Sequence, residues 1–226
     1  KADASRIYGL ELEHMLSPHN LNFLVYKDTL IEEHIAGIPG DEFIKDFLPK
    51  CTVAERSQIA KSFVKFNERC MIRLLGDMRA YNYVIIPIHD FDKVIYKIRA
   101  IDFDQQCYEG RLKVYRPQFF KENLPMVDLV KKHLTKASVD QYKIEERATI
   151  ARRILSNETR LTHLLKCMLN DHISSPEKIA QLREEVYELT KQSSFLKSRS
   201  MGEVMRSAFH FVKRNYKNHE MLRVNR

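Results

Sequence analysis

The fold is decided by one stretch of the chain, which reads Leu75-Gly76-Asp77-Met78-Arg79-Ala80-Tyr81-Asn82-Tyr83-Val84-Ile85. It begins where a long amphipathic pattern ends, and it finishes in an apolar run of strand-like residues. Asp77 and Asn82 are therefore expected in a short loop between a helix and a strand. A second acidic stretch, Ile101-Asp102-Phe103-Asp104, follows a further apolar run.

The segments around this stretch predict a long helix and two β-hairpins. Thr52 and Glu55 have the spacing of a capping box, and the helix that they start is expected to run to about Leu74. The strands are expected at 21–26 and 29–35, and at 83–88 and 94–102 with a turn at 89–92. Because a hairpin brings its two ends together, Asn82 and Asp102 are expected to lie close in space.

The remainder of the chain reads mainly as helices. Short ones are expected at 6–16 and 41–47, and longer ones at 126–135, 139–155, 157–169, 176–191 and 201–217. Ser138 and Gln141, and likewise Ser200 and Glu203, have capping-box spacing, and Ser175-Pro176 is a typical helix start. The segment 108–121 is rich in aromatic and cationic residues, and we expect it to pack as ordered structure rather than to dock a substrate. One hydrophobic core is expected to hold most of the chain together.

Composition excludes several classes of protein. The chain has 226 residues, of which 44% are hydrophobic and 30% charged, so it is not disordered as a whole. No apolar run approaches the roughly 18 residues needed to cross a bilayer, and residues 1–6 lack the apolar core of a secretion signal. Four widely spaced cysteines favour reduced thiols over a metal or disulfide scaffold. We expect a cytoplasmic protein with no membrane partner.

The positive charge is confined to the second half. Residues 131–226 hold 20 Lys and Arg against 11 Asp and Glu, whereas residues 1–130 hold 18 against 19. A basic surface can attract nucleic acid or another polyanion. Here the cations are interleaved with glutamates along amphipathic patterns, which is typical of solvated helical faces. Nucleic acid is therefore not the partner that we expect.

The residue types in the deciding stretch favour phosphate chemistry. An Asn oxygen together with an Asp carboxylate forms a hard-oxygen site suited to Mg²⁺ that carries nucleotide phosphates. Asn82 and Asp102 are the candidate ligands. Asp77 is then left to orient an attacking hydroxyl or to accept its proton.

This arrangement resembles the active site of the protein-kinase-like superfamily, in which a D-x-x-x-x-N loop is followed by a metal-binding Asp. Gly76-Asp77 and Ile101-Asp102-Phe103 are most similar to aminoglycoside-phosphotransferase-like small-molecule kinases. Upstream, the segment 30–40 resembles the hinge strand and linker of that group. Leu10-Glu11-Leu12-Glu13-His14 resembles the helix that supplies a glutamate to a phosphate-binding lysine.

The resemblance implies an α+β fold, namely a protein-kinase-like C-lobe with two β-hairpins and a mostly α-helical C-terminal half. Residues 1–40 would be an N-lobe remnant and hinge, and residues 41–226 the C-lobe with a helical C-terminal extension. The implied function is ATP- and Mg²⁺-dependent transfer of a phosphoryl group to an alcohol, on a small molecule or a protein.

The resemblance also implies residue roles. Asp77 and Arg79 would be catalytic, with Arg79 neutralising the transferred phosphoryl group. Asn82 and Asp102 would hold the metal. The backbone around Glu32, Glu33, His34 and Ile35 would receive the adenine of the nucleotide.

Departures from the family pattern keep a second function open. Leu75 stands where protein kinases have a histidine, and Asp104 stands where they have the glycine of D-F-G. The Gly-rich loop and its lysine would lie before residue 1, and the chain does not begin with Met, so we expect a fragment. The alternative is a catalytically inactive, pseudokinase-like interaction module.

Asp102-Phe103-Asp104 also matches the D-x-D of haloacid-dehalogenase-like phosphatases and of nucleotide-sugar transferases.

Overall fold

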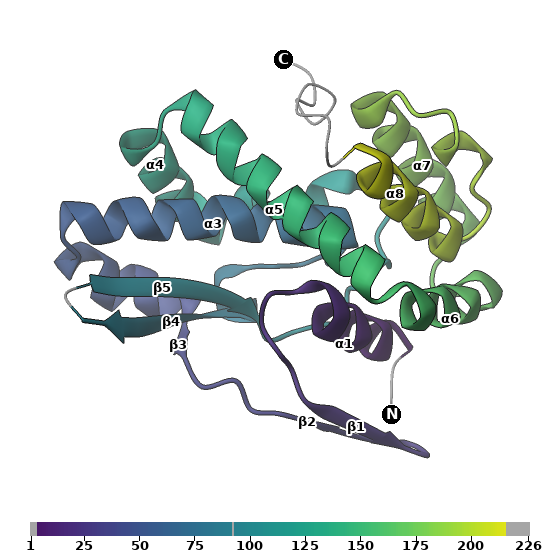
Figure 1. Cartoon of the computed structure of the whole chain (residues 1–226), viewed down its shortest axis with the longest axis horizontal. Coiled ribbons are helices and arrows are strands. Elements are labelled where there is room, and N and C mark those ends of the chain that lie inside the picture. The colour runs from purple at the N-terminus through teal and green to yellow at the C-terminus, as the bar shows by residue number, and fades with distance from the viewer. Residues whose placement is uncertain (1–3, 92, 216–226) are drawn as a thin grey trace.

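The structure is a computed structural model that describes residues 4–91 and 93–215, and it has an α+β fold in which helices predominate (Figure 1). The helices are α1 (Ala4–Leu16), α2 (Gly40–Glu42), α3 (Val53–Arg73), α4 (Leu124–His133), α5 (Lys136–Ser156), α6 (Glu158–Asn170), α7 (Pro176–Thr190) and α8 (Met201–Asn215). The strands are β1 (Phe23–Tyr26), β2 (Thr29–Glu32), β3 (Ile38–Pro39), β4 (Tyr83–Asp90) and β5 (Lys93–Ala100).

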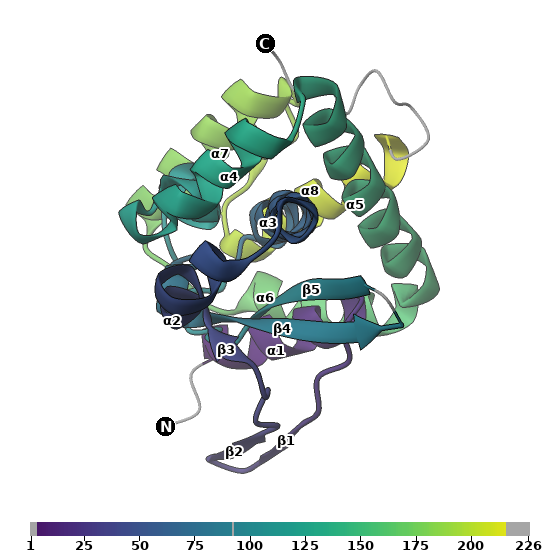
Figure 2. The same cartoon turned by 90° about the vertical axis from the view of Figure 1, so that its left-hand side faces the viewer.

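Helix α3 runs through the middle of the molecule. Figure 2 looks along its axis and shows the sheet of β3, β4 and β5 on one side, with α4 and α5 around the others. The helix starts at the expected capping box, in which Thr52 Oγ1 accepts from the Glu55 amide at 3.3 Å and Glu55 Oε2 accepts from the Thr52 amide at 2.7 Å. It buries the apolar stripe that its sequence predicts, which consists of Ile59, Phe63, Phe66 and Cys70.

The two hairpins form, but β2 and β5 end earlier than expected, whereas β4 continues to Asp90 through residues expected in the turn. In the three-stranded antiparallel sheet, β4 pairs with β5 from Tyr83 opposite Ala100 to Asp90 opposite Lys93. Strand β5 therefore stops two residues before Asp102, because the chain turns there and buries Phe103. Strands β1 and β2 form a separate two-stranded sheet, and β2 ends at Glu32 rather than at residue 35.

The expectation of a single hydrophobic core was wrong in detail, since the core has two clusters. One surrounds the sheet, α3 and α4, and includes Phe63, Tyr83 and Phe103. The other lies among α5 to α8 and includes Met168 and Phe209. Helix α1 contributes side chains to both clusters, and so does α3 together with its C-cap Leu74. These two helices therefore join the two halves.

The five long helices of the second half are present; α7 and α8 start at the expected residues, whereas α4, α5 and α6 start one to three residues away from them. The N-cap of α5 is Thr135, whose hydroxyl accepts from the Ser138 amide at 3.2 Å, so the cap expected at Ser138 was wrong by one turn. Helix α4 starts at Leu124 because Pro125 occupies its first turn. Residues 216–217 of the last expected helix and residue 92 of the expected turn lie outside the described residues. Within the described ranges, no helix is both long and apolar enough to span a bilayer.

Candidate active site

The loop after α3 is closed by its own hydrogen bonds. Leu74 ends the helix in the left-handed conformation, at φ 52°, and Asp77 adopts the same conformation at φ 55°. The Asn82 side-chain amide donates to the Asp77 carbonyl at 2.7 Å and reaches its carboxylate at 3.5 Å. Asp tolerates left-handed backbone better than most residues, and such conformations gather at functional loops. The D-x-x-x-x-N segment is thus a compact turn whose two polar ends meet.

The segment that carries Asp102 is tied to this loop at two points. The Ile101 amide donates to the Asn82 carbonyl at 3.0 Å, and the Gly76 amide donates to the Gln105 carbonyl at 3.1 Å. Asp102 and Asp104 lie between these two ties in the sequence. The sequence expectation that the ends of the hairpin come together is therefore met by the backbone.

Arg79 fixes the position of the Asp77 carboxylate. Its Nε donates to Asp77 Oδ1 at 3.0 Å, and a terminal nitrogen donates to Glu122 Oε1 at 2.9 Å. The guanidinium also lies over the ring of Phe120, with 5.1 Å between Cζ and the ring centroid. The hydrogen bond to Asp77 is the main reason that the pKa of Arg79 is raised. These bonds use Nε and one terminal nitrogen, and the expected contact with a phosphoryl group would fall to the other terminal nitrogen of the guanidinium.

Asp102 faces a cation that the sequence analysis did not identify. Arg6 on α1 donates from one terminal nitrogen to Asp102 Oδ1 at 3.3 Å and to Asp104 Oδ1 at 2.8 Å. Its other nitrogens bind the Glu32 carboxylate, one of them at 2.9 Å from Oε2. The bond to Glu32 is the largest cause of a raised pKa for Arg6. Three carboxylates from two parts of the chain, the end of β2 and the turn after β5, therefore converge on one guanidinium.

The segment expected to receive adenine follows β2 directly. Glu32 is the last residue of β2 and is held by Arg6, and the Glu33 amide donates to the Asn22 carbonyl at 2.9 Å. His34 is exposed, whereas Ile35 is buried in the cluster around the sheet. The bond from Glu33 to Asn22 is the last backbone bond between the two sides of this hairpin. Within the segment Glu32–Ile35, the backbone groups of His34 and Ile35 therefore lie past the hairpin.

Asn123 anchors the far side of the loop. Its side-chain amide donates to the carbonyls of Met78, at 2.9 Å, and of Pro117, at 2.8 Å. Its oxygen accepts from the Tyr83 hydroxyl at 2.9 Å. Asn123 is fully buried, and these bonds give each polar atom of its side chain a partner, as buried polar groups require. They fasten the loop both to β4 and to the turns that precede α4.

Both glutamates of α1 pair with arginines. Glu13 is buried and pairs with Arg73 on α3, and Glu11 pairs with Arg160 on α6 at 2.7 Å. The expectation drawn from the kinase resemblance, that one of them would pair with a lysine, finds no partner of that type among the described residues. Both instead dock α1 onto its neighbouring helices.

Three residues of the site were missed by sequence reasoning, namely Arg6, Glu122 and Asn123. No local pattern marks Arg6, since its partners lie 26, 96 and 98 positions away. Glu122 gives no signal either. Asn123 precedes Leu124-Pro125, and an Asn before a Pro at a helix start could have marked it as a boundary residue.

The cation-binding capacity of the site is limited to a few oxygens. In the part of the chain that the structure describes, no three or more His, Cys, Asp or Glu side chains are placed to hold a metal ion together. Asn82 uses its side-chain nitrogen as a donor, so its Oδ1 is the atom left to face a cation.

Comparison of the chain with protein-family models, with curated proteins and with solved structures gives no match.

Proposed function

We propose that the protein is an ATP- and Mg²⁺-dependent phosphotransferase of the protein-kinase-like type, acting on an alcohol. The observation that carries this proposal is the double tie between the two acidic segments. Hydrogen bonds from Ile101 to Asn82 and from Gly76 to Gln105 hold the Asp77–Asn82 loop beside the turn that contains Asp102. Phosphoryl transfer relies on positioning and electrostatics more than on covalent chemistry, so such a fixed arrangement is what it requires.

Asp77 is the residue proposed to orient the acceptor hydroxyl and to accept its proton. Its carboxylate is about one-third exposed, so an acceptor can approach it. The bond from Arg79 holds Oδ1 of Asp77 in place, and Oδ2 faces the side-chain amide of Asn82. Arg79 is therefore proposed as a positioning residue for Asp77 as well as a cation near the transferred group.

Asn82 and Asp102 fit a Mg²⁺ ion by the chemistry of their donor atoms. Both offer hard oxygens, and Mg²⁺ in nucleotide sites commonly uses one or two protein carboxylates together with water and phosphates. When bound, the ion would neutralise negative charge on the nucleotide phosphates. The backbone of His34 and Ile35, at the far end of the Glu32–Ile35 segment, would receive the adenine.

One observation favours the second candidate, a catalytically inactive interaction module. Arg6 already neutralises Asp102, and it also bridges Asp104 and Glu32. Nucleotide-bound Mg²⁺ would have to compete with this guanidinium for the Asp102 carboxylate. A protein in which Arg6 stays bound to Asp102 would keep the shape of the site but would not transfer phosphoryl groups.

Thermal denaturation with ATP, with and without Mg²⁺, separates the two functions, because a ligand that binds only the folded state raises the melting temperature. We expect stabilisation that depends on Mg²⁺. Asp102→Ala should abolish the Mg²⁺-dependent part, whereas Asp77→Ala should keep most of the binding and lose turnover.

Asp128→Ala provides a matched control, since Asp128 is an exposed carboxylate on α4. This variant should behave as the wild type does in binding and turnover. Equal melting temperatures with and without nucleotide in the wild type would reject the phosphotransferase and favour the interaction module.

A further inference from the structure

A cavity of about 380 Å³ lies between helix α4 and the first turns of α3, next to the short helical turns at residues 43–50. Leu48 and Leu129 line it and are buried, whereas Pro125 and Lys132 line it and are exposed. The cavity therefore has a floor inside the protein and opens to solvent beside α4. Its volume lies in the range of about 300–1,000 Å³ that is typical of pockets for small molecules.

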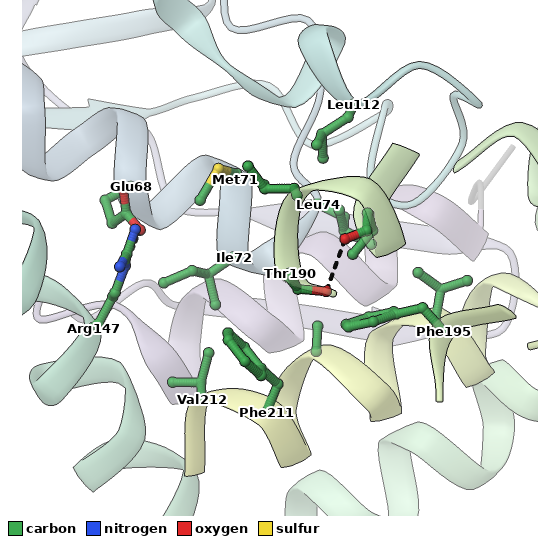
Figure 3. A pocket seen from close by; sticks show the side chains of 14 residues that line it. Glu68, Met71, Ile72, Leu74, Leu112, Arg147, Thr190, Phe195, Phe211 and Val212 are labelled. Atoms are coloured by element: carbon green, nitrogen blue, oxygen red, sulfur yellow. Dashed lines mark hydrogen bonds and ion pairs between the residues drawn. The ribbon is translucent and has the colours of Figure 1, made fainter. Parts of the chain in front are cut away.

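A second, smaller space in the protein is a packing gap. It has about 60 Å³ and lies among α3, α5, α7 and α8, where Figure 3 shows Phe211 along one wall. The polar side chains of its lining already bind within the protein. The Thr190 hydroxyl donates to the Val186 carbonyl at 2.8 Å. Glu68 pairs with Arg147, so this space gives a ligand nothing to recognise.

The larger cavity differs, because two polar side chains of its lining are not satisfied within the protein. Nε of Arg56 on α3 and Nε2 of His133 on α4 are buried, and neither has a hydrogen-bond partner among the described residues. A buried polar group without a partner costs about 1–3 kcal/mol. The Arg56 guanidinium is held at the cavity, since one terminal nitrogen donates to the Pro49 carbonyl at 2.8 Å. A ligand that brings acceptor oxygens between these side chains is therefore favoured.

The charges on the lining favour an anion that carries a single negative charge. Arg56 and Lys132 are cations, and neither forms an ion pair with a carboxylate in the part of the chain that the structure describes. The acid on the lining is Asp128, which lies 3.7 Å from Lys131 on the exposed side of α4. With His133 counted as neutral, two cations and one carboxylate leave a net charge of +1 on the lining. A carboxylate matches this charge, whereas a phosphate monoester carries about −1.5 to −2 at pH 7.

The remaining walls of the cavity are apolar. They consist of Ile44, Leu48, Pro49, Pro125 and Leu129. Small-molecule pockets commonly combine such walls with a few placed polar groups that fix the orientation of the ligand. A bare inorganic anion would leave these walls without contacts, so the ligand is expected to have an apolar body.

We propose that this cavity binds a small organic monocarboxylate with a compact apolar body. The carboxylate would lie between Arg56 and His133, and the body would pack against Leu48 and Leu129. None of the residues that line the cavity belongs to the Asp77–Asn82 loop or to the turn that contains Asp102. The proposed site is therefore independent of the proposed phosphotransferase function.

Methyl NMR titration of the whole chain tests this proposal. Benzoate, 2-naphthoate and hexanoate are each expected to shift the methyl signals of Ile44, Leu48 and Leu129 in a saturable way, because these side chains line the cavity. 2-Naphthamide has the same rings without the charge and should bind at least about tenfold more weakly than 2-naphthoate. Absence of saturable shifts with all three carboxylates would overturn the proposal. Equal affinity for 2-naphthoate and 2-naphthamide would do so as well, and so would saturable shifts with inorganic phosphate alone.

Arg56→Ala tests the position of the carboxylate, and isothermal titration calorimetry measures the affinity. This variant should bind 2-naphthoate at least about tenfold more weakly, because hydrogen bonds to charged groups are strong. Arg152→Ala removes an exposed arginine from α5 and should bind as the wild type does. Unchanged affinity in Arg56→Ala would overturn the proposal.

Two exposed positions on α4 keep the test decisive if Arg56→Ala does not fold. Asp128→Asn removes the negative charge of the lining and should strengthen binding of 2-naphthoate by about threefold. Lys132→Ala removes a positive charge and should weaken it by about the same factor. Unchanged affinity in both variants, or changes of the opposite sign, would overturn the proposal.

Discussion

Glu13 on α1 and Arg73 on α3 form an ion pair whose side chains are only 4% and 2% exposed. Burial alone would raise the pKa of Glu13, but the positive charges of Arg73 and Arg69 outweigh it, and the pKa is lowered. The carboxylate is thus kept ionised inside the protein. Removing one member of such a pair leaves the other charge buried without its partner.

We expect Glu13→Ala to lower the free energy of unfolding by about 3–5 kcal/mol, measured by urea denaturation at pH 7. Glu11→Ala is the matched control on the same helix, because its partner Arg160 is half exposed and the pair should contribute less than about 1 kcal/mol. Similar losses in the two variants would contradict the expectation that the buried Glu13–Arg73 pair matters more for stability than the exposed Glu11–Arg160 pair.

Asn123→Asp tests the anchor of the active-site loop. A carboxylate cannot donate, so the carbonyls of Met78 and Pro117 would lose their donor, and a charge would be placed in a buried site. We expect a loss of roughly 2–4 kcal/mol in the free energy of unfolding. Tyr83→Phe removes a single bond to the same residue and should cost about 1 kcal/mol. A larger effect of Tyr83→Phe than of Asn123→Asp would refute the anchoring role.

We expect His19 to make the stability of the protein depend on pH. Burial is the main cause that lowers its pKa from 6.5 to about 4, with help from the charge of Arg69 and against the opposing charge of Glu13. Between pH 6.5 and pH 4 the unfolded state binds the proton more readily than the folded state does, so stability falls as the pH is lowered through this window.

Urea denaturation from pH 7 to pH 4 measures this effect. His19→Gln should make the free energy of unfolding fall by roughly 1–2 kcal/mol less between pH 7 and pH 4 than it does in the wild type. This difference is smaller than the full pKa shift implies, because the side chain still reaches solvent. His210→Gln, on an exposed position of α8, should keep the wild-type slope. An unchanged slope in His19→Gln would show that other groups set the pH dependence.

The basic half of the chain is expected to bind nucleic acid only weakly. Several of its cations are paired with acids, including Lys178 with Glu109 at 3.0 Å and Arg160 with Glu11 at 2.7 Å. Fluorescence anisotropy with labelled oligonucleotides should give a Kd weaker than about 1 μM at about 150 mM salt, with no preference among sequences. Tighter, sequence-dependent binding would point to a nucleic-acid-associated protein.

The parts of the fold that local rules govern were predictable from the sequence. Thr52 and Glu55 define the start of α3 because a capping box is satisfied within one turn. The hairpin of β4 and β5 follows from two apolar runs separated by a polar turn. The start of α5 was misplaced because Thr135 and Ser138 lie three residues apart and are both residue types that cap helices well.

The candidate site was predictable only in part. The approach of Asn82 to the Asp102 segment follows from hairpin geometry, and the backbone bond to Ile101 agrees with it. The contacts of Arg6 could not be read from the sequence, because an arginine in the first turn of an amphipathic helix looks like any solvated residue. Its partners are set by how α1 docks against the sheet, which is a property of the tertiary structure.

The position of α3 between the two hydrophobic clusters has a consequence for how the chain opens. Helix α3 packs side chains into both clusters, so unfolding of either cluster removes packing contacts from a helix that the other cluster also needs. The two halves are therefore expected to unfold in a single cooperative transition rather than as independent units. Backbone amides in the middle of α3 should exchange their hydrogens with solvent only when the whole molecule unfolds, whereas those of the β1–β2 hairpin should exchange through local opening.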